Sequence, residues 1–303
     1  MMNVNPESVR VIAKKDFQDA VRSMLFWGLS IFFFMLLAAI TGLIWYFAGD
    51  PILEDELTTP ILVATVSEVT RIIIPLIALI LGWKAIAGER EAGSMKVLLS
   101  LPHSRADVVL GKLIGRSLVL SLSLVIGFAL AAVVVAAFMG MFGIGEYVGL
   151  LVISILYGVA YVSIAVFVSS LTRSTTFAGI GVFSVFLIFY VLWNMIATAA
   201  QTLVILEYIE GSEWTFVING EEQPIELAPH WALFLESLDP GNAYSNVLSV
   251  VADAVEMGGT LGDLTAFEET VFYTSEWFAL LVLILWIVVP FGVAVFAFER
   301  ADL

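Results

Sequence analysis

Residues 83–112 read WKAIAGEREAGSMKVLLSLPHSRADVVLGK, and this charged stretch lies between two long apolar runs. Together with Arg116 it holds six of the chain's 13 basic residues, and glycines and a proline interrupt it. Such a segment cannot lie in hydrocarbon, because nothing there satisfies its charges or its irregular backbone. The stretch is therefore predicted to be a polar loop at a membrane surface that separates two membrane spans.

The composition supports a membrane protein. Of the 303 residues, 60% are hydrophobic and only 14% are charged, with a mean hydropathy of +1.01, whereas soluble domains carry about 25% charged residues. A helix of about 20 apolar residues crosses a hydrocarbon core of about 30 Å. The chain contains six such runs and is predicted to be an all-α polytopic membrane protein. The predicted spans are Met24–Phe47, Ile61–Ala87, Leu113–Met139, Val148–Val168, Thr176–Ala200 and Trp277–Phe298.

The basic residues predict the orientation. They precede the first span, fill the loop 84–112, and occur between spans four and five and after span six; the loops 48–60, 140–147 and 201–276 contain none. The positive-inside rule then places both termini in the cytoplasm of a multi-pass protein in the cell membrane. The opposite loops hold 19 of the 28 acidic residues. This acidity fits either a halophile's solvated surface or an outer vestibule that concentrates cations.

The spans divide the chain into four segments. Residues 1–23 are predicted to form an amphipathic helix along the cytoplasmic interface, with an ordinary solvated leader as the alternative. Residues 24–200 contain spans one to five, and residues 277–303 contain span six and a tail. Residues 201–276 are expected to form a small extracytoplasmic cap. Within it, Asn219-Gly220 favours a β-hairpin and residues 243–257 favour a short helix.

Motifs for chemistry are missing from the sequence. The phosphate-binding pattern G-x-x-x-x-G-K-[ST] does not occur, cysteine is absent, and His103 and His230 are the only histidines. The basic loop is short and tethered to the membrane, so nucleic-acid binding has no support. We therefore expect no catalytic residue, no cofactor site, no metal site and no nucleic-acid partner.

The polar loop resembles the cytoplasmic loop of ABC-2 type permeases, the membrane subunits of one class of ATP-binding-cassette exporters. In those proteins the pattern is E-R-E-x-G-[TS], a Leu-rich helix, P-x-S-R and a Gly-Lys that enters span three. The matching segments are Glu89–Ser94, Leu98–Arg105 and Leu110–Lys112, and the chain end Phe298–Leu303 is also similar. The chain length and the acidic outer segment look most similar to the permeases linked to copper-enzyme maturation in nitrous-oxide respiration.

The resemblance implies a coupling helix that docks on a separate ATPase, with two ATPase copies per transporter and a second permease chain as homodimer or heterodimer partner. ATP would bind to the ATPase, and the substrate would be exported. In this interpretation Gly93 permits either a close backbone approach or a turn, Pro102 ends a helix over residues 95–101, and Ser104 caps the next helix. The alternative is a solvated loop that only sets topology. The candidate coupling residues are Glu89, Arg90, Glu91, Gly93, Ser94, Pro102, Ser104, Arg105 and Lys112, with Arg173 in the turn 169–175 as a second contact.

Three polar residues within the spans are candidates for a translocation path. Arg71 lies thirteen residues before Lys84, which is about 20 Å along a helix, and an unpaired arginine there is costly. It either pairs with Glu68 on the same helix face or lines an exit path. Asn194 is predicted to make an interhelical hydrogen bond or to line that path.

Two other function classes remain open from the sequence. One is a secondary transporter or channel without an ATPase, which would need polar groups in several spans. The other is a non-transporting membrane anchor for an ATPase.

Overall fold

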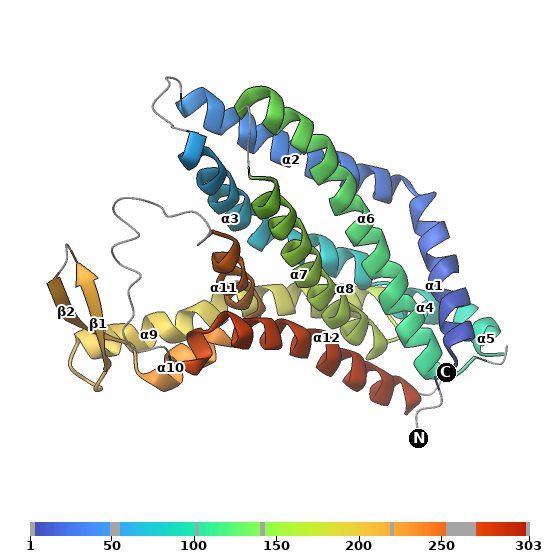
Figure 1. Ribbon diagram of the computed structural model, residues 1–303. Helices are drawn as coiled ribbons and strands as arrows, with labels where there is room; N and C mark the ends of the chain where they lie inside the picture. Colours follow the sequence, from blue (N-terminus) through green and yellow to red (C-terminus); the bar gives the residue numbers. More distant parts are fainter. Residues whose placement is uncertain are drawn as a thin grey trace.

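The computed structural model describes residues 4–48, 55–100, 103–139, 143–218, 221–252 and 271–300. These residues include six helices that are long and apolar enough to cross a membrane, which confirms the predicted all-α polytopic class. Figure 1 shows them packed as a tilted bundle. The six are α2 (Met24–Ala48), α3 (Asp55–Gly82), α6 (Arg105–Met139), α7 (Ile144–Ser170), the run α8–η1–α9 (Thr175–Ile205) and α12 (Glu276–Glu299).

Short helices gather at one end of the bundle, which we call the basic end. They are α1 (Pro6–Val21), α4 (Ala87–Glu91) and α5 (Ser94–Leu99), and they lie beside the start of α6 and the last turn of α12 (Figure 1). The amphipathic helix predicted over the leader is thus present as α1. We call α4, α5 and the turn between them the platform.

The segment after α9 is mixed. Strands β1 (Ser212–Ile218) and β2 (Glu221–Leu227) form the predicted antiparallel hairpin, whose turn residues 219–220 lie outside the described residues. The helices α10 (His230–Ser237) and α11 (Pro240–Ala252) and the 3₁₀ turn η3 (Phe272–Thr274) follow. The helix predicted over 243–257 is therefore found in α11, although its expected end lies outside the described residues.

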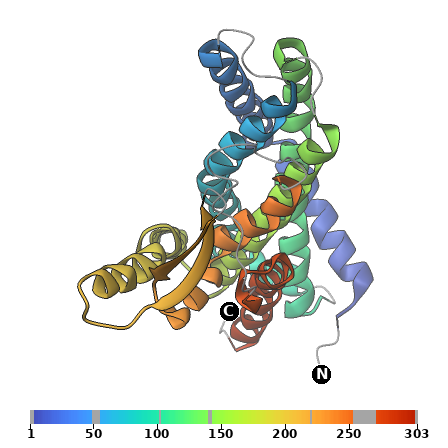
Figure 2. The same ribbon diagram turned by 60° about the vertical axis from the view of Figure 1, so that its left-hand side comes forward.

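Helix α11 does not stand apart as a separate cap. It packs against α12, α7 and α3, so part of the 201–276 segment enters the helix bundle. Figure 2 shows α11 lying along α7, while the hairpin and α10 extend to the side with α9. The sequence could not indicate this, because the apolar face of α11 is too short to be read as a span.

The fifth span is interrupted. Between α8 (Thr175–Leu187) and α9 (Asn194–Ile205), residues Ile188–Trp193 form a π-helix. The Asn194 side-chain amide donates to the carbonyl oxygens of Phe189 and Tyr190, both at 3.2 Å. Within the described part of the chain, the hydrogen bonds of the Asn194 side chain therefore lie within the fifth span, and not between helices as predicted. Single π turns are rare and occur often at functional sites.

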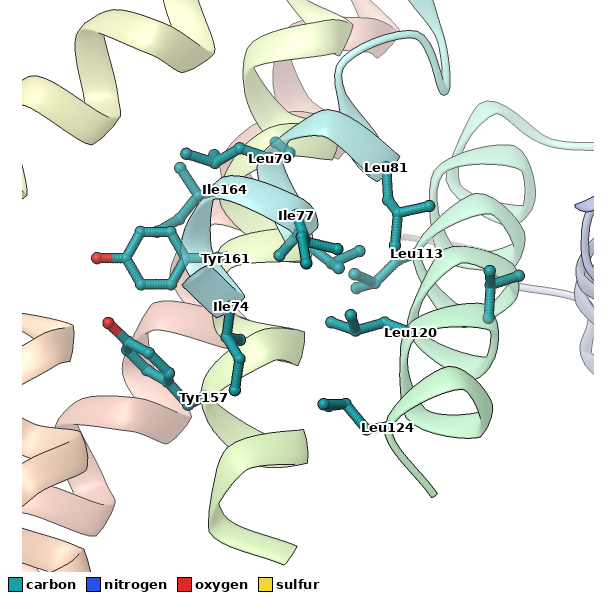
Figure 3. Packing of buried hydrophobic residues seen from close by; sticks show 14 of the residues in the cluster. Ile74, Ile77, Leu79, Leu81, Leu113, Leu120, Leu124, Tyr157, Tyr161 and Ile164 are labelled. Carbon is teal, nitrogen blue, oxygen red and sulfur yellow. The ribbon is translucent and has the colours of Figure 1, made fainter. Parts of the chain in front are cut away.

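Helix α7 is the centre of the core. In the apolar stretch of α7, 56% of the residues are buried, against 17% in the apolar stretch of the run 175–205. Figure 3 shows Tyr157, Tyr161 and Ile164 of this helix close to Ile74 and Ile77 of α3, with Leu120 and Leu124 of α6 nearby. Burial of these side chains fixes the spans against one another by close packing.

Two glycines allow α1 to lie directly on α6. A Cβ added at Gly111 would come within 2.7 Å of the Ile12 side chain, and one at Gly115 within 2.8 Å of the Asp16 carboxylate. Glycines spaced four residues apart commonly permit such close helix packing. The buried face of α1 includes Ile12, Ala13 and Asp16. The leader is therefore held by protein contacts along α6.

The Gly115→Ala variant should be destabilised, because the new methyl group would meet Asp16 and, at 3.2 Å, the carbonyl oxygen of Ala13. Overpacking of this kind costs about 1–3 kcal/mol. The measurement is the thermal unfolding midpoint of the purified chain in detergent. Gly42→Ala in α2 is the control, since nothing lies within 4 Å of its Cβ position. Equal midpoints for the two variants would contradict this account of the α1–α6 contact.

Candidate functional site

The start of α6 is fixed by a capping box. The Asp107 amide donates to the Ser104 hydroxyl oxygen at 3.0 Å, and the Ser104 amide donates to the Asp107 carboxylate at 2.9 Å. This confirms the predicted cap at Ser104. The second Asp107 oxygen accepts the amide of Asn5 at 2.8 Å, and Asn5 itself caps α1. One buried carboxylate thus anchors the first turns of both α1 and α6.

A buried network of charges joins α1, α4 and α6. Lys112 Nζ lies 2.8 Å from Asp16 Oδ1 and 2.5 Å from Glu89 Oε1, and Arg116 Nε lies 3.0 Å from Asp16 Oδ2. The side chains of Lys112 and Asp16 are 7% and 4% exposed. Charged groups this deeply buried require partners, because an unpaired one costs several kcal/mol. Two predicted coupling residues, Glu89 of α4 and Lys112 of α6, therefore bind each other.

Two arginines contact the end of α12, Arg90 from the platform and Arg105 from the start of α6. Arg105 donates to the carbonyl oxygens of Phe298 and Glu299 at 2.6 and 2.8 Å. Such contacts satisfy carbonyls that the last helical turn leaves unpaired, and they complement the helix dipole. The guanidinium groups of Arg90 and Arg105 lie 5.8 and 5.7 Å from the ring centroid of Phe298, which is fully buried. Both arginines thus hold helix ends together.

The platform is also joined to the turn between α7 and α8. The Ser169 hydroxyl accepts the amides of Ile86 and Ala87, at 3.1 and 3.0 Å, and so caps α4 from another helix. In return, Glu91 accepts the Thr175 amide at 2.7 Å at the start of α8. Arg90 donates to the carbonyl oxygens of residues 170 and 172 in the same turn. Helix α4 is therefore fastened to three spans.

The exposed part of the platform is the turn between α4 and α5 and the residues next to it. Glu91, Gly93, Ser94 and Lys96 are exposed, and Met95 below them is buried. Gly93 has a φ of +74°, with nothing within 4 Å of its Cβ position, so its role is the turn and not a close backbone approach. The Ser94 hydroxyl donates to the Glu89 carbonyl oxygen at 3.3 Å.

The remaining predicted contacts at this end differ in outcome. Arg173 is exposed in the turn beside the platform. Pro102 lies outside the described residues, as does Leu101 at the predicted helix end. The coupling role of this set of residues stays a prediction.

Arg71 has a partner that the sequence did not indicate. Its guanidinium lies 3.9 Å from Asp239 Oδ2 and donates to the side-chain oxygen of Asn242, at the start of α11. The described ion pairs of Arg71 do not include Glu68, which is exposed. Asp239 is 4% exposed and caps α11 by accepting the Asn242 amide at 2.8 Å. Burial raises the pKa of its carboxyl group to about 6.

Tyrosines complete the contact between α11 and the spans. The Tyr157 hydroxyl donates to the Arg71 carbonyl oxygen at 2.9 Å, and its ring stacks on that of Tyr244 with centroids 4.5 Å apart. The Tyr244 hydroxyl shares hydrogen bonds with Thr70 and Ser154, at 2.8 and 3.1 Å. Buried tyrosines normally find such partners. A polar contact therefore locks α11 to α3 and α7.

Arg71, Asp239 and Asn242 lie between two cavities. The first is a narrow cavity of about 10 Å³ among the spans. It is lined by Arg71, Pro75, Tyr157, Tyr161, Phe186, Phe189, Tyr190, Asn194, Asp239 and Gly241. The second, of about 250 Å³, is lined by Trp214, Leu227, Leu233, Glu236, Ser237, Asn242, Asn246, Tyr273 and Thr274. Of the predicted path residues, Arg71 and Asn194 thus share one cavity, whereas Glu68 does not line it.

Sequence reasoning missed Asp16, Asp239 and the Ser169 cap. Asp16 carried a signal, since it falls on the apolar face of α1 between Ala13 and Ala20. The spacing of Gly111 and Gly115 was a second signal for close packing. Asp239 and Ser169 carried no local signal, because their partners lie in distant segments of the chain. Among the described residues, no group of three or more metal-ligating side chains is found.

The bundle, the platform fastened to its spans and the polar contact inside it define a membrane-embedded transport subunit. Residues 10–303 match the family described as ABC-2 family transporter protein, and the chain belongs to that family. It is similar to proteins named probable ABC transporter permease protein NosY. The relative from Pseudomonas aeruginosa is 27% identical over 262 residues, which cover 84% of this chain and 86% of the relative. The one from Stutzerimonas stutzeri is 34% identical over 125 residues, or 41% and 44% of the two chains.

These comparisons confirm the predicted ABC-2 permease and its likeness to the NosY branch. The protein is a multi-pass membrane subunit of an ABC transporter.

Replacing Lys112 by Met should destabilise the chain by about 3–5 kcal/mol, because Asp16 then lies buried with one of its two cationic partners removed. The measurement is chemical or thermal unfolding in detergent. Lys96→Met is the control, since Lys96 is exposed on α5. Adding Asp16→Asn to Lys112→Met should cost less than the sum of the two single changes. Strict additivity would show that the pair is not coupled.

Proposed function

We propose that this chain is the permease of an exporter in the cytoplasmic membrane, with both termini and the platform in the cytoplasm. Two copies of a separate ATP-binding-cassette ATPase bind and hydrolyse ATP, and a second permease chain completes the membrane pore. No nucleotide-binding residue is assigned to this chain. The absence of arginine and lysine from the segment 201–276 supports this orientation.

One observation carries the proposal: the platform is fastened to the ends of several spans at once. Its contacts reach α6 through Lys112, the last turn of α7 through Ser169, and the end of α12 through Arg90, whose guanidinium group faces the ring of Phe298. A displacement of the platform is therefore transmitted to these helices through direct contacts. A solvated loop that only sets topology needs none of these contacts.

The contacts divide the coupling residues into two roles. Glu89, Arg90 and Arg105 direct their charged groups at neighbouring helices, so we assign them to transmission. The exposed turn from Glu91 to Lys96 is the surface that remains for the ATPase, with Arg173 beside it. This assignment refines the docking role that the sequence motif suggests for Glu89 and Arg90.

We further propose that the substrate path passes the first cavity and is closed by Arg71, Asp239 and Asn242. These residues bind one another between the two cavities, and Asn194 faces the first of them. Breaking the contact would join the two cavities and open the path toward the outer segment. Motion of α3 or α11 driven from the platform would serve as the trigger.

The docking surface is tested by capture of a co-expressed ATP-binding-cassette ATPase on the tagged full-length permease. The Ala92→Arg/Lys96→Glu double variant should retain about tenfold less ATPase, because a changed charge pattern at an interface disfavours the partner. Its thermal midpoint should match that of the unaltered chain, since both side chains are exposed.

The control for this experiment is Glu213→Lys, a charge reversal at an exposed position on β1. It should capture the ATPase normally. Unchanged capture by the double variant would overturn the assignment of the turn as the docking surface. Capture of no ATPase by the unaltered chain would overturn the proposed transporter itself.

The closure is tested with single cysteines, because the chain contains none of its own. In intact cells, a membrane-impermeant maleimide should react slowly with Asn194→Cys. Adding Arg71→Gln should raise that rate about fivefold or more, since the ion pair with Asp239 is removed.

Two positions calibrate this labelling. Glu213→Cys should react in intact cells, and Ser94→Cys should react only after permeabilisation. The reverse pattern would overturn the orientation. An Asn194→Cys rate that Arg71→Gln leaves unchanged would overturn the closure.

A further inference from the structure

An apolar groove of about 570 Å³ runs between α1 and the start of α6. Its walls include Val9, Ala13 and Phe17 of α1 and Ile114 and Leu118 of α6. Its volume is within the range of about 300–1,000 Å³ that is usual for small-molecule sites. Almost no polar atom lines it, so water is a poor occupant.

The depth of the groove follows from the predicted third span, Leu113–Met139. Ile114 and Leu118 lie at the inner end of that span, where the hydrocarbon begins. The remainder of the groove, toward Val9 and Arg10, continues at the depth of the lipid headgroups.

The rim of the groove is basic. Arg10 and Lys14 line it, lie one helical turn apart on α1 and are exposed. Neither forms an ion pair with an acidic side chain among the described residues, whereas Lys112 and Arg116 on the neighbouring face are both paired. Glu7 is one turn before Arg10, so the rim is not purely positive. Two unpaired cations above an apolar groove complement a ligand that is anionic at one end and apolar at the other.

We propose that this groove binds an anionic phospholipid of the inner leaflet. The headgroup-proximal part of an acyl chain lies between α1 and α6, and the phosphate lies beside Arg10 and Lys14. The lipid covers apolar wall that would otherwise face water at headgroup depth. Because the same helix holds Asp16, the bound lipid supports the packing of α1 on α6. The choice of the inner leaflet rests on the proposed orientation, whereas the test requires neither ATPase nor substrate.

The test is titration of phosphatidylglycerol into the full-length chain in mild detergent, followed by native mass spectrometry. The Arg10→Gln/Lys14→Gln variant should bind about 25-fold more weakly, from about fivefold for each basic side chain lost near a lipid phosphate. The matched control is Lys15→Gln/Arg22→Gln, which removes the same charge from two exposed positions, one in α1 and one directly after it, that do not line the groove. The control should change the affinity less than twofold.

Further measurements separate the contributions of the lipid's acyl chain and of its headgroup. Ile114→Trp should fill the groove and lower the occupancy, whereas Val133→Trp, at an exposed position of α6 outside the groove, should not. Phosphatidylcholine and free glycerol 1-phosphate should each bind at least tenfold more weakly than phosphatidylglycerol. Equal losses from both double variants, or equal binding of phosphatidylcholine or glycerol 1-phosphate, would overturn the proposal.

Discussion

The basic end of the molecule depends on one buried carboxylate. Asp16 is buried, and a buried carboxylate is costly without partners; α6 supplies two cationic partners one turn apart, Lys112 and Arg116. Glycines on the same helix let α1 come close enough for these contacts. Because Lys112 also binds Glu89, the same charge that secures α1 sets the position of α4. The N-terminal helix, the third span and the platform are therefore one mechanical unit.

The spans could be predicted because their signal is local: each is a run of apolar residues of sufficient length. The hairpin at Asn219-Gly220 and the cap at Ser104 have local signals too, and the structure contains both. The partner of Arg71 has none. Glu68 was the nearest acid in the sequence, but α11 enters the bundle and brings Asp239 to the same guanidinium. Contacts that depend on how distant segments pack cannot be inferred from spacing alone.

The polar loop illustrates the difference between residue type and residue position. Charged residues in a loop favour an exposed, partner-facing interpretation, yet Arg90 and Arg105 direct their guanidinium groups at carbonyl oxygens of neighbouring helix ends. Helix ends leave carbonyl groups without hydrogen-bond donors, and the several N–H groups of arginine can donate to them. The charge pattern of the loop thus has an internal structural cause, in addition to the docking role that we propose for its exposed turn. Its exposed surface is smaller than the motif suggests.

The π-helical segment Ile188–Trp193 determines which way the side chains of the following helix α9 face around the helix axis. A π turn holds about one residue more than an α turn, and each α-helical residue advances by about 100°. The side chains of α9 are therefore rotated about the helix axis by about 100° relative to a continuous α-helix. This rotation turns Asn194 toward the cavity beside Arg71. The length of this segment, and not only its composition, is thus constrained: loss of a single residue would turn Asn194 away from the cavity that Arg71 and Asp239 line.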